Sequence, residues 1–187
     1  EPVDPAPERK IVPWPDSEEG LVFKWENTRS ENSVPMANGE RRICRVTAKG
    51  LARFSSSYGM RIDGGHFVAD EESAVAIANA CAASGEFTIE ALVTERTLEA
   101  NPDLSTRLLG YSMGDGFAFA VYRIRNVLSA QFTLGMDGAS AEYNVPLGPV
   151  RIEENRPFQL VLTVKGEKVY YYVDGVFITE FDHTRES

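Results

Sequence analysis

The sequence predicts an all-β fold, a two-sheet antiparallel sandwich with one short helix near residues 71–83. The first observation is the stretch 158–181, FQLVLTVKGEKVYYYVDGVFITEF, in which apolar and polar residues alternate through three consecutive strands. The second is a series of short alternating segments separated by glycine-containing turns along most of the chain. The third is that only one stretch breaks this alternation. A meander as regular as 158–181 needs a second sheet to cover its apolar face.

The first twenty residues differ from the rest in composition. They carry five of the ten prolines among acidic residues, which favours an extended tether over packed structure. We therefore expect a Pro-rich tether at 1–20 and a folded domain at 21–187. The domain opens with LVFKWE at 21–26, which alternates well enough to predict a first strand, and a polar loop is expected at 27–42.

Short strands are expected at 43–47, 51–54, 60–62 and 66–69. The next stretch, DEESAVAIANACAAS at 70–84, is rich in alanine and has helical signals at both ends. Asp70 is placed to cap the helix, Glu71 and Glu72 lie in its first turn, and Gly85 follows its last residue. Cys81 is predicted to face a sheet.

The second half of the chain reads as strands alone. Strands are predicted at 86–94, 106–112, 117–125, 127–134, 141–145, 158–164, 168–173 and 176–181. The dipeptide Asp174-Gly175 is a two-residue hairpin signal between the last two strands. We expect about ten or eleven strands and one helix to form in all, which indicates a curved two-sheet sandwich.

Size and charge exclude several classes of function. With 187 residues, 43% of them hydrophobic, the chain can bury one full core. The net charge of −9, with no basic cluster to act as a phosphate footprint, argues against nucleic acid and anionic membrane as partners, and no apolar run predicts insertion into a membrane. The sequence has no initiator Met and no leader, so we interpret it as a mature or trimmed segment. Cys44 and Cys81 leave a single disulfide and free thiols both open.

With the strands placed, several segments resemble the laminin G-like jelly-roll domains of the concanavalin A-like lectin and glucanase superfamily. The resemblance rests on an ordered set of phrases over roughly residues 21–181: VFKW at 22–25, FTIEA at 87–91, LLGY at 108–111, the strand 158–164 and YVDG at 172–175. It differs at Leu92, where many relatives have Trp. Relatives also continue beyond the Asp-Gly hairpin, so we expect that the last strands are missing. Otherwise the N-terminal segment fills their place, or an open sheet edge needs a partner.

The resemblance implies a jelly-roll sandwich that serves as a noncatalytic recognition module of a larger exported protein, extracellular, periplasmic or on the cell surface. Its expected ligand is a carbohydrate or a protein partner. Two alternatives remain, a glycoside hydrolase of the glucanase type and a purely structural or interaction domain.

A carbohydrate site on such a fold would be a shallow face that combines aromatic rings with planar polar groups. Residues of this kind in the polar phases of the strands are also typical of the outer face of any antiparallel sheet. The polar phases offer Tyr122, Arg123, Gln131, Gln159, Thr163, Tyr170 and Tyr172. All of these except Thr163 are the six predicted ligand-binding residues.

The enzyme alternative depends on one strand. Glucanases of this superfamily carry Glu-x-Asp-x-Glu on a strand, and the comparable positions here are Glu86, Thr88 and Glu90. Thr88 replaces the central Asp that would separate the pKa values of the two glutamates, so Glu86 and Glu90 are read as a solvated strand face. His66 and His183, the two histidines, have no nucleophile motif near them that would predict a catalytic triad.

Four aspartates precede glycine: Asp63, Asp115, Asp137 and Asp174. Asp-Gly is the preferred sequence of a tight hairpin turn, and this is the simpler interpretation for each. Carboxylates on such loops could also hold a structural Ca²⁺, as they often do in laminin G-like domains. Asp115 and Asp137 are the best candidates for metal ligands because they flank strands expected to be adjacent. We expect that no cofactor is required.

Overall fold

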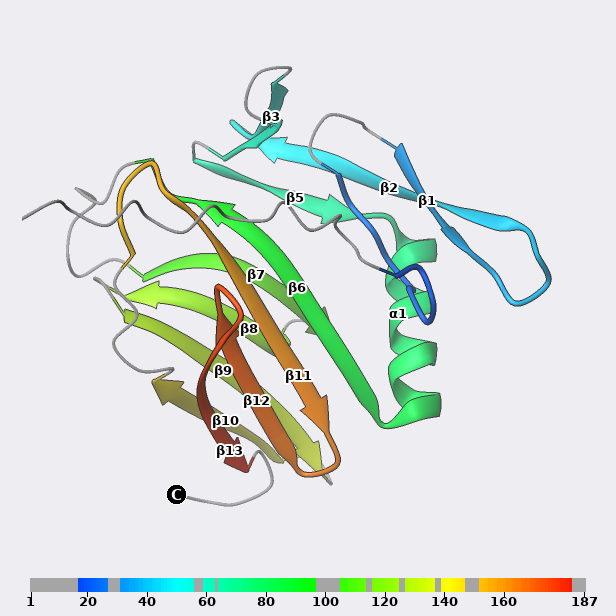
Figure 1. Cartoon of the computed structure of the whole chain (residues 1–187). Helices are drawn as coiled ribbons and strands as arrows, with labels where there is room; N and C mark the ends of the chain where they lie inside the picture. Colours follow the sequence, from blue (N-terminus) through cyan, green and yellow to red (C-terminus); the bar gives the residue numbers. More distant parts are fainter. Residues whose placement is uncertain are drawn as a thin grey trace, which may run out of the picture. The chain divides into compact units, whose positions relative to one another are not determined.

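The computed structural model describes residues 17–26, 31–55, 59–62, 64–96, 105–113, 116–124, 127–136, 139–146 and 152–182. The chain divides into two compact units, Glu1–Ala83 and Ser84–Ser187. Each unit is described by itself below, with the labels of Figure 1.

The first unit contains five short strands and a helix. They are β1 (Glu31–Pro35), β2 (Arg41–Gly50), β3 (Arg53–Ser55), β4 (Gly59–Arg61), β5 (Gly65–Ala69) and α1 (Glu71–Ser84), whose last residue lies across the boundary. Strands β1, β2 and β5 form an antiparallel sheet in that order, and β3 pairs with β4 in a separate hairpin. The predicted strands at 43–47, 51–54, 60–62 and 66–69 correspond to β2 to β5.

The prediction of a polar loop over 27–42 is wrong for Glu31–Pro35, which forms β1. A tight turn returns the chain to β2, with the Met36 amide donating to the Glu40 carbonyl at 2.8 Å. Gly39 lies at this turn with φ of 84°, a conformation that glycine adopts without strain. Because β1 is an edge strand with mostly polar residues, its own pattern carries little strand signal, and pairing with β2 supplies the stabilisation.

The prediction of a strand at 21–26 is also wrong. The segment joins no sheet, and two of its backbone groups are bonded to side chains. The Arg42 guanidinium donates to the Val22 carbonyl, and the Glu26 amide donates to Asn32 Oδ1 at 3.2 Å. Apolar alternation can therefore hold a segment against a surface without a ladder.

The predicted helix is confirmed as α1, and Asp70 is its N-cap. The Ser73 amide donates to Asp70 Oδ1 at 2.9 Å, as a capping carboxylate requires. Burial opposes ionisation of Asp70, but the hydrogen bonds from Ser73 and the charges of Arg45 and Arg42 outweigh it, so the pKa of Asp70 lies below its usual value.

The second unit contains two four-stranded antiparallel sheets. Its strands are β6 (Glu86–Thr94), β7 (Ser105–Met113), β8 (Gly116–Ile124), β9 (Val127–Met136), β10 (Ala139–Pro146), β11 (Pro157–Lys165), β12 (Lys168–Val173) and β13 (Val176–Asp182). One sheet has the order β10-β9-β8-β7, the other β13-β12-β11-β6. The predicted all-β sandwich is thereby confirmed, with every strand expected after residue 85 present.

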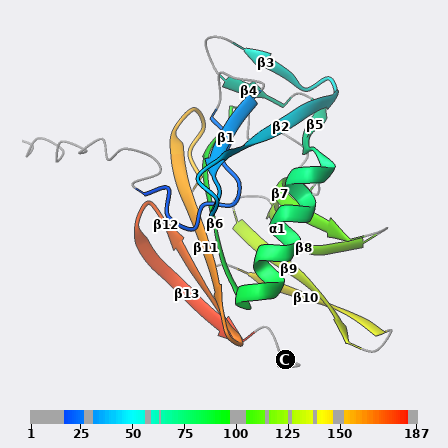
Figure 2. The same ribbon diagram turned by 90° about the vertical axis from the view of Figure 1, so that its right-hand side faces the viewer.

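The two sheets of the second unit enclose one hydrophobic core. Figure 2 shows them as two layers. One phase of β8, β9, β11 and β12 points inward, as the alternation predicts. The buried members of the core are Phe119, Val121, Leu128, Ala130, Ile152, Phe158, Leu160, Leu162, Val164, Val169, Tyr171 and Val173.

The hairpin between β12 and β13 has the predicted turn. Asp174 and Gly175 have φ values of 49° and 76°, the two positive angles of a type I′ turn. Asp174 Oδ1 accepts the Gln159 amide at 2.9 Å, and the Asp174 amide donates to the Gln159 carbonyl at 2.9 Å. The Asp174 carboxylate therefore stabilises the conformation of this turn by accepting the Gln159 amide.

Both cysteines are free thiols, which decides between the two alternatives left open by the sequence. Cys44 is buried in β2, and Cys81 is half-buried in α1, where burial raises the pKa of its thiol. No helix in the described part of the chain is long and apolar enough to cross a membrane.

Candidate binding face

The sheet β13-β12-β11-β6 presents one face to the core and a second face outward. Because side chains alternate along a strand, the outward residues follow from the register. We call this surface the outer face. Its members are Glu86, Thr88, Glu90 and Leu92 of β6, Gln159, Val161, Thr163 and Lys165 of β11, Lys168, Tyr170 and Tyr172 of β12, and Phe177, Glu180 and Asp182 of β13.

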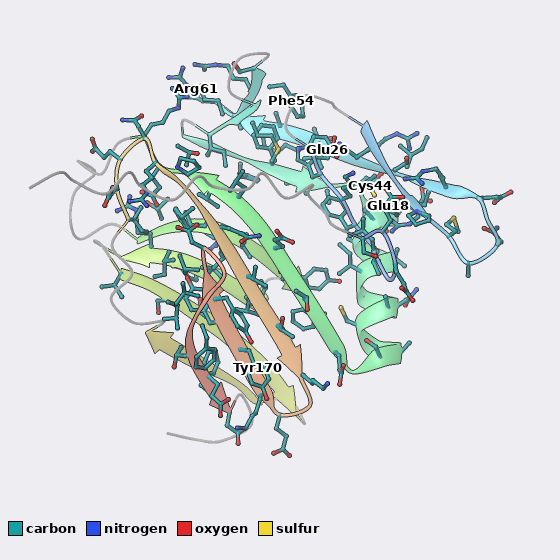
Figure 3. All side chains as sticks on the ribbon, viewed as in Figure 1. Glu18, Glu26, Cys44, Phe54, Arg61 and Tyr170 are labelled. Carbon is teal, nitrogen blue, oxygen red and sulfur yellow. The ribbon has the colours of Figure 1, made fainter. Side chains whose placement is uncertain are left out.

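Three of the six predicted ligand-binding residues lie on the outer face: Gln159, Tyr170 and Tyr172. Each side chain is half-buried, since its neighbours cover part of it and leave the rest accessible. Tyr170 lies opposite Thr163, and Tyr172 lies opposite Val161. Figure 3 labels Tyr170 on β12, in the half of the strand that follows the turn from β11.

An aromatic pair stands on this face. The rings of Tyr172 and Phe177 have centroids 5.6 Å apart and planes inclined at 66°, the edge-to-face geometry that aromatic side chains prefer. Phe177 is 51% exposed. A register shift between Tyr171 and Tyr172 sets Phe177 opposite Tyr172. Phe177 is not among the predicted ligand-binding residues, because its pairing with Tyr172 depends on this register shift.

A polar pair lies two strands away from Phe177. The Gln159 side-chain amide donates to Glu90 Oε1, while the Gln159 backbone is held by Asp174. Gln159 Oε1 and the second carboxylate oxygen of Glu90 make no hydrogen bond with another described residue. The pair is fixed in position and presents acceptor atoms to anything that approaches the sheet.

The outer face is apolar along one band and polar beside it. Val161, Tyr172 and Phe177 lie opposite one another on β11, β12 and β13, and the β6 residue opposite Val161 is Glu90. Leu92, which is 65% exposed, extends the band diagonally, because it lies opposite Gln159. On the side toward the β11–β12 turn, the Thr88 and Thr163 hydroxyls are 3.0 Å apart and hydrogen-bonded to each other. This combination of apolar and planar polar groups is suited to a ligand that has both kinds of surface.

The two glutamates of the enzyme alternative lie on the outer face with Thr88 between them. Glu86 is exposed and opposite Lys165, whereas the Glu90 carboxylate is engaged by Gln159. The central position is a neutral hydroxyl bonded to Thr163. The strand therefore lacks the third carboxylate that the glucanase pattern places at this point.

Tyr122 and Gln131 belong to the other sheet of the second unit. Tyr122 lies on the face of β8 opposite to Val121, and Gln131 follows core residue Ala130 on β9. The Arg107 guanidinium carbon is 5.3 Å from the centre of the Tyr122 ring, and Arg107 Nη2 donates to the Tyr122 hydroxyl at 3.3 Å. The six predicted ligand-binding residues therefore do not form one site.

Arg123 is a correction to the predicted set. It lies in the inward phase of β8 with 4% of its surface exposed, and its Nε is 2.6 Å from Glu95 Oε2. Nη2 also reaches Thr106 Oγ1 at 3.4 Å. Burial raises the pKa of Glu95, and the charge and hydrogen bond of Arg123 oppose this rise. The Arg123 guanidinium therefore links β8 to Glu95, the residue that follows β6. It is not available to a surface ligand.

Asp115, Asp137, Asp63 and His183 lie outside the described residues, so the metal ligands Asp115 and Asp137 stay a prediction. Within the described ranges, no three His, Cys, Asp or Glu side chains come together in a group that could hold a metal ion. His66 is exposed on β5.

No family model matches the chain, and no curated protein matches it. Among solved structures, it is similar to the binding domain of botulinum neurotoxin DC in complex with rat synaptotagmin II, with 13% identity and a TM-score of 0.46. The similarity covers 83% of this chain and 40% of that chain, so the present sequence spans less than half the length of that structure.

Proposed function

We propose that the chain is a noncatalytic recognition module of an exported multidomain protein and that the outer face binds uncharged carbohydrate. The proposal rests on one observation: the Tyr172–Phe177 pair, in which Phe177 is exposed and Tyr172 half-buried, lies on the same sheet face as the Gln159–Glu90 pair. The sequence resemblance to laminin G-like domains supports the same class, with an extracellular, periplasmic or cell-surface location.

The chemistry of a sugar matches both halves of this arrangement. The C–H surface of a pyranose packs against aromatic rings, and its hydroxyl groups donate hydrogen bonds to fixed acceptors. Gln159 uses one of its two amide protons on Glu90, so the pair offers Gln159 Oε1 and the second Glu90 oxygen as acceptors and one amide N–H as a donor, a set that suits the hydroxyl groups of a sugar. Glu90 on the outer face disfavours acidic sugars, because a second negative charge would face its carboxylate, whereas the charge of Glu180 is compensated by Lys168.

A glycan array with and without Ca²⁺, followed by titration calorimetry of the positive sugars, tests the proposal. We expect binding to uncharged glycans, weakened at least tenfold by Tyr172→Ala and by Gln159→Ala. Tyr122→Ala is the matched control, since Tyr122 lies on the other sheet and should bind normally. Loss of binding on addition of a chelator would assign a role to Ca²⁺. Absence of binding to every glycan in both conditions would contradict the proposal.

A protein partner is the second candidate. The exposure of Leu92 at one edge of the apolar band favours it, because an aliphatic side chain gains less from a sugar than from an apolar protein surface. Leu92→Ser separates the two candidates. It should leave glycan affinity nearly unchanged if the aromatic and acceptor pairs form the site, and it should abolish binding if the whole band is a protein interface.

A further inference from the structure

The acidic chain contains one segment with the opposite charge. Between Arg41 and Ile62 there are six basic residues and no acidic residue, although the whole chain carries −9. The segment includes β2, β3 and β4. The expectation that anionic surfaces are unlikely partners, which rests on the net charge and on the lack of a basic cluster, overlooks this segment. The local charge of this segment is therefore positive, opposite in sign to the net charge of the chain.

Several of these basic residues gather at one end of the first unit. Lys49 lies opposite His66 at the end of the β2–β5 ladder, and the chain continues directly to Leu51. The β3–β4 hairpin follows, with Arg53 directly opposite Arg61. We call this set the β3–β4 tip: Lys49, Leu51, Arg53, Arg61, Ile62 and His66.

A close backbone approach holds these parts together. A Cβ atom on Gly65 would lie 2.2 Å from the Lys49 carbonyl oxygen and 2.5 Å from the Ala52 amide nitrogen, so only glycine fits there. The Leu51 amide also donates to the Gly64 carbonyl at 3.5 Å. The start of β5 is thus packed against the connection from β2 to β3.

The two faces of the β3–β4 hairpin have different surroundings. Phe54 shares one face with Met60, and its ring packs against Trp25 and Phe67 at centroid distances of 5.7 and 5.0 Å. Arg53 and Arg61 share the other face, which is turned away from this aromatic cluster. Figure 3 shows Phe54 and Arg61 at this end of the unit.

Two aliphatic side chains accompany the cations. Leu51 is 67% exposed and Ile62 is 57% exposed, and neither lies within a strand. Exposed aliphatic groups gain nothing from a phosphodiester backbone in water, but they are stabilised in the interfacial layer of a bilayer, where basic side chains meet lipid phosphates. This combination favours a lipid surface over a nucleic acid.

We propose that the β3–β4 tip is a peripheral contact site for the surface of an anionic lipid bilayer. Lys49, Arg53 and Arg61 interact with headgroup phosphates and carboxylates, and Leu51 and Ile62 enter the boundary between headgroups and acyl chains. The contact involves side chains of a turn and a hairpin and no membrane-spanning element. It is independent of the outer face of the second unit.

Vesicle co-sedimentation of the full chain tests this. We expect binding to phosphatidylcholine vesicles that contain about 30 mol % phosphatidylserine, weak binding to phosphatidylcholine alone, and loss of binding at high salt. Arg53→Gln with Arg61→Gln should lower the partition coefficient about twenty-five-fold, because each charge contributes about a factor of five. Leu51→Ser with Ile62→Ser should lower it without changing the salt dependence.

Arg96→Gln with Arg156→Gln is the matched control, because it removes two exposed arginine charges from the second unit, neither of them on the outer face. It should leave the partition coefficient unchanged, and circular dichroism should verify that every variant is folded. Equal binding to both vesicle types, or equal loss in the control, would overturn the proposal. Tighter binding to heparin or duplex DNA than to the anionic vesicles would also overturn it, in favour of a polyanion in solution.

Discussion

Tyr171 carries a hydroxyl group into the core of the second unit. The residue is fully buried, the hydroxyl has no hydrogen-bond partner among the described residues, and burial raises its pKa far above the usual value. An unpaired buried hydroxyl costs free energy that a phenyl ring avoids. Tyr171→Phe should therefore raise the free energy of unfolding by about 1 kcal/mol, measured by urea denaturation.

Tyr170→Phe is the control for this prediction. Tyr170 lies next to Tyr171 in the chain but on the outer face, so its hydroxyl is accessible to water and its removal should change stability little. A loss of stability in Tyr171→Phe would mean that the hydroxyl has a partner.

Asp70 predicts a dependence of stability on pH. Its folded-state pKa lies below the unfolded value, so the ionised carboxylate stabilises the fold above about pH 4, and this contribution is lost as the pH falls through the lower folded pKa. Asn caps a helix about as well but does not titrate. The wild type should therefore be more stable than Asp70→Asn at neutral pH, and the difference should disappear in acid.

Thermal unfolding of both proteins between neutral pH and pH 3 measures this difference. Asp70→Ala should lose about 1 kcal/mol at neutral pH, because the Ser73 amide then has no capping acceptor. A difference between wild type and Asp70→Asn that does not change with pH would contradict the role given to the charge.

At the same scale, the prediction that Tyr122 and Arg123 both bind a ligand did not follow the alternation of their strand. Neighbours on a strand point to opposite faces, so Tyr122 and Arg123 cannot both belong to one surface. Arg123 falls in the phase of Phe119 and Val121, and Glu95 continues the apolar phase of β6 two residues after Val93. Strict use of the alternation would have predicted both charges as buried.

At the scale of elements, the Glu95–Arg123 pair connects the end of β6 in one sheet with β8 in the other. Removal of one partner leaves the other charge buried without compensation, so Glu95→Ala and Arg123→Ala should each lower the free energy of unfolding by about 3–5 kcal/mol. The double variant Glu95→Leu/Arg123→Met should lose much less, because both charges are replaced by apolar groups of similar size.

Chemical denaturation of the three variants measures these losses. If each single variant lost under about 1 kcal/mol, the pair would be hydrated like a surface ion pair and would not connect the two sheets.

The strand that sequence reasoning missed, β1, is one whose stability comes from its partner. The meander over 158–181 was predicted because each of its strands has its own apolar phase, whereas β1 is mostly polar and depends on β2. The segment 21–26 shows the reverse, since its alternation is strand-like but its hydrogen bonds go to Arg42 and Asn32. Pairing is a property of two segments, and one segment's pattern does not contain it.

The sheet edges are a separate question at this scale. Strands β13 and β6 are the edges of one sheet of the second unit, and β10 and β7 are the edges of the other. A register shift and the charges of Glu180 and Asp182 on β13 are features that discourage pairing with another chain. Association through an open edge stays a prediction.

At the scale of the whole molecule, the second unit contains its own core. Every member of the hydrophobic cluster, buried or partly buried, lies between Phe87 and Phe181. The fragment 84–187 should therefore fold on its own and unfold in one cooperative transition. Calorimetry and near-ultraviolet circular dichroism of the fragment test this, and a fragment without a thermal transition would show that its core needs residues before 84.

The sandwich was predictable because alternation is repeated in every long strand of the second unit, whereas the site was predictable only in part. Gln159, Tyr170 and Tyr172 fall on one sheet and Tyr122 and Gln131 on the other, and no sequence pattern states which strands share a sheet. Phe177 joins Tyr172 only through a register shift. The chemistry of a binding face depends on these pairings.

The central claim is that the outer face of the β13-β12-β11-β6 sheet binds uncharged carbohydrate. The most direct measurement is a map of backbone amide chemical shifts in the isotope-labelled full chain, titrated with the glycan that binds best on the array. We predict saturable shifts centred on Gln159, Tyr172 and Phe177, with the amides of β8 and β9 unchanged. Shifts confined to β7–β10, or no shifts with any glycan, would contradict the account.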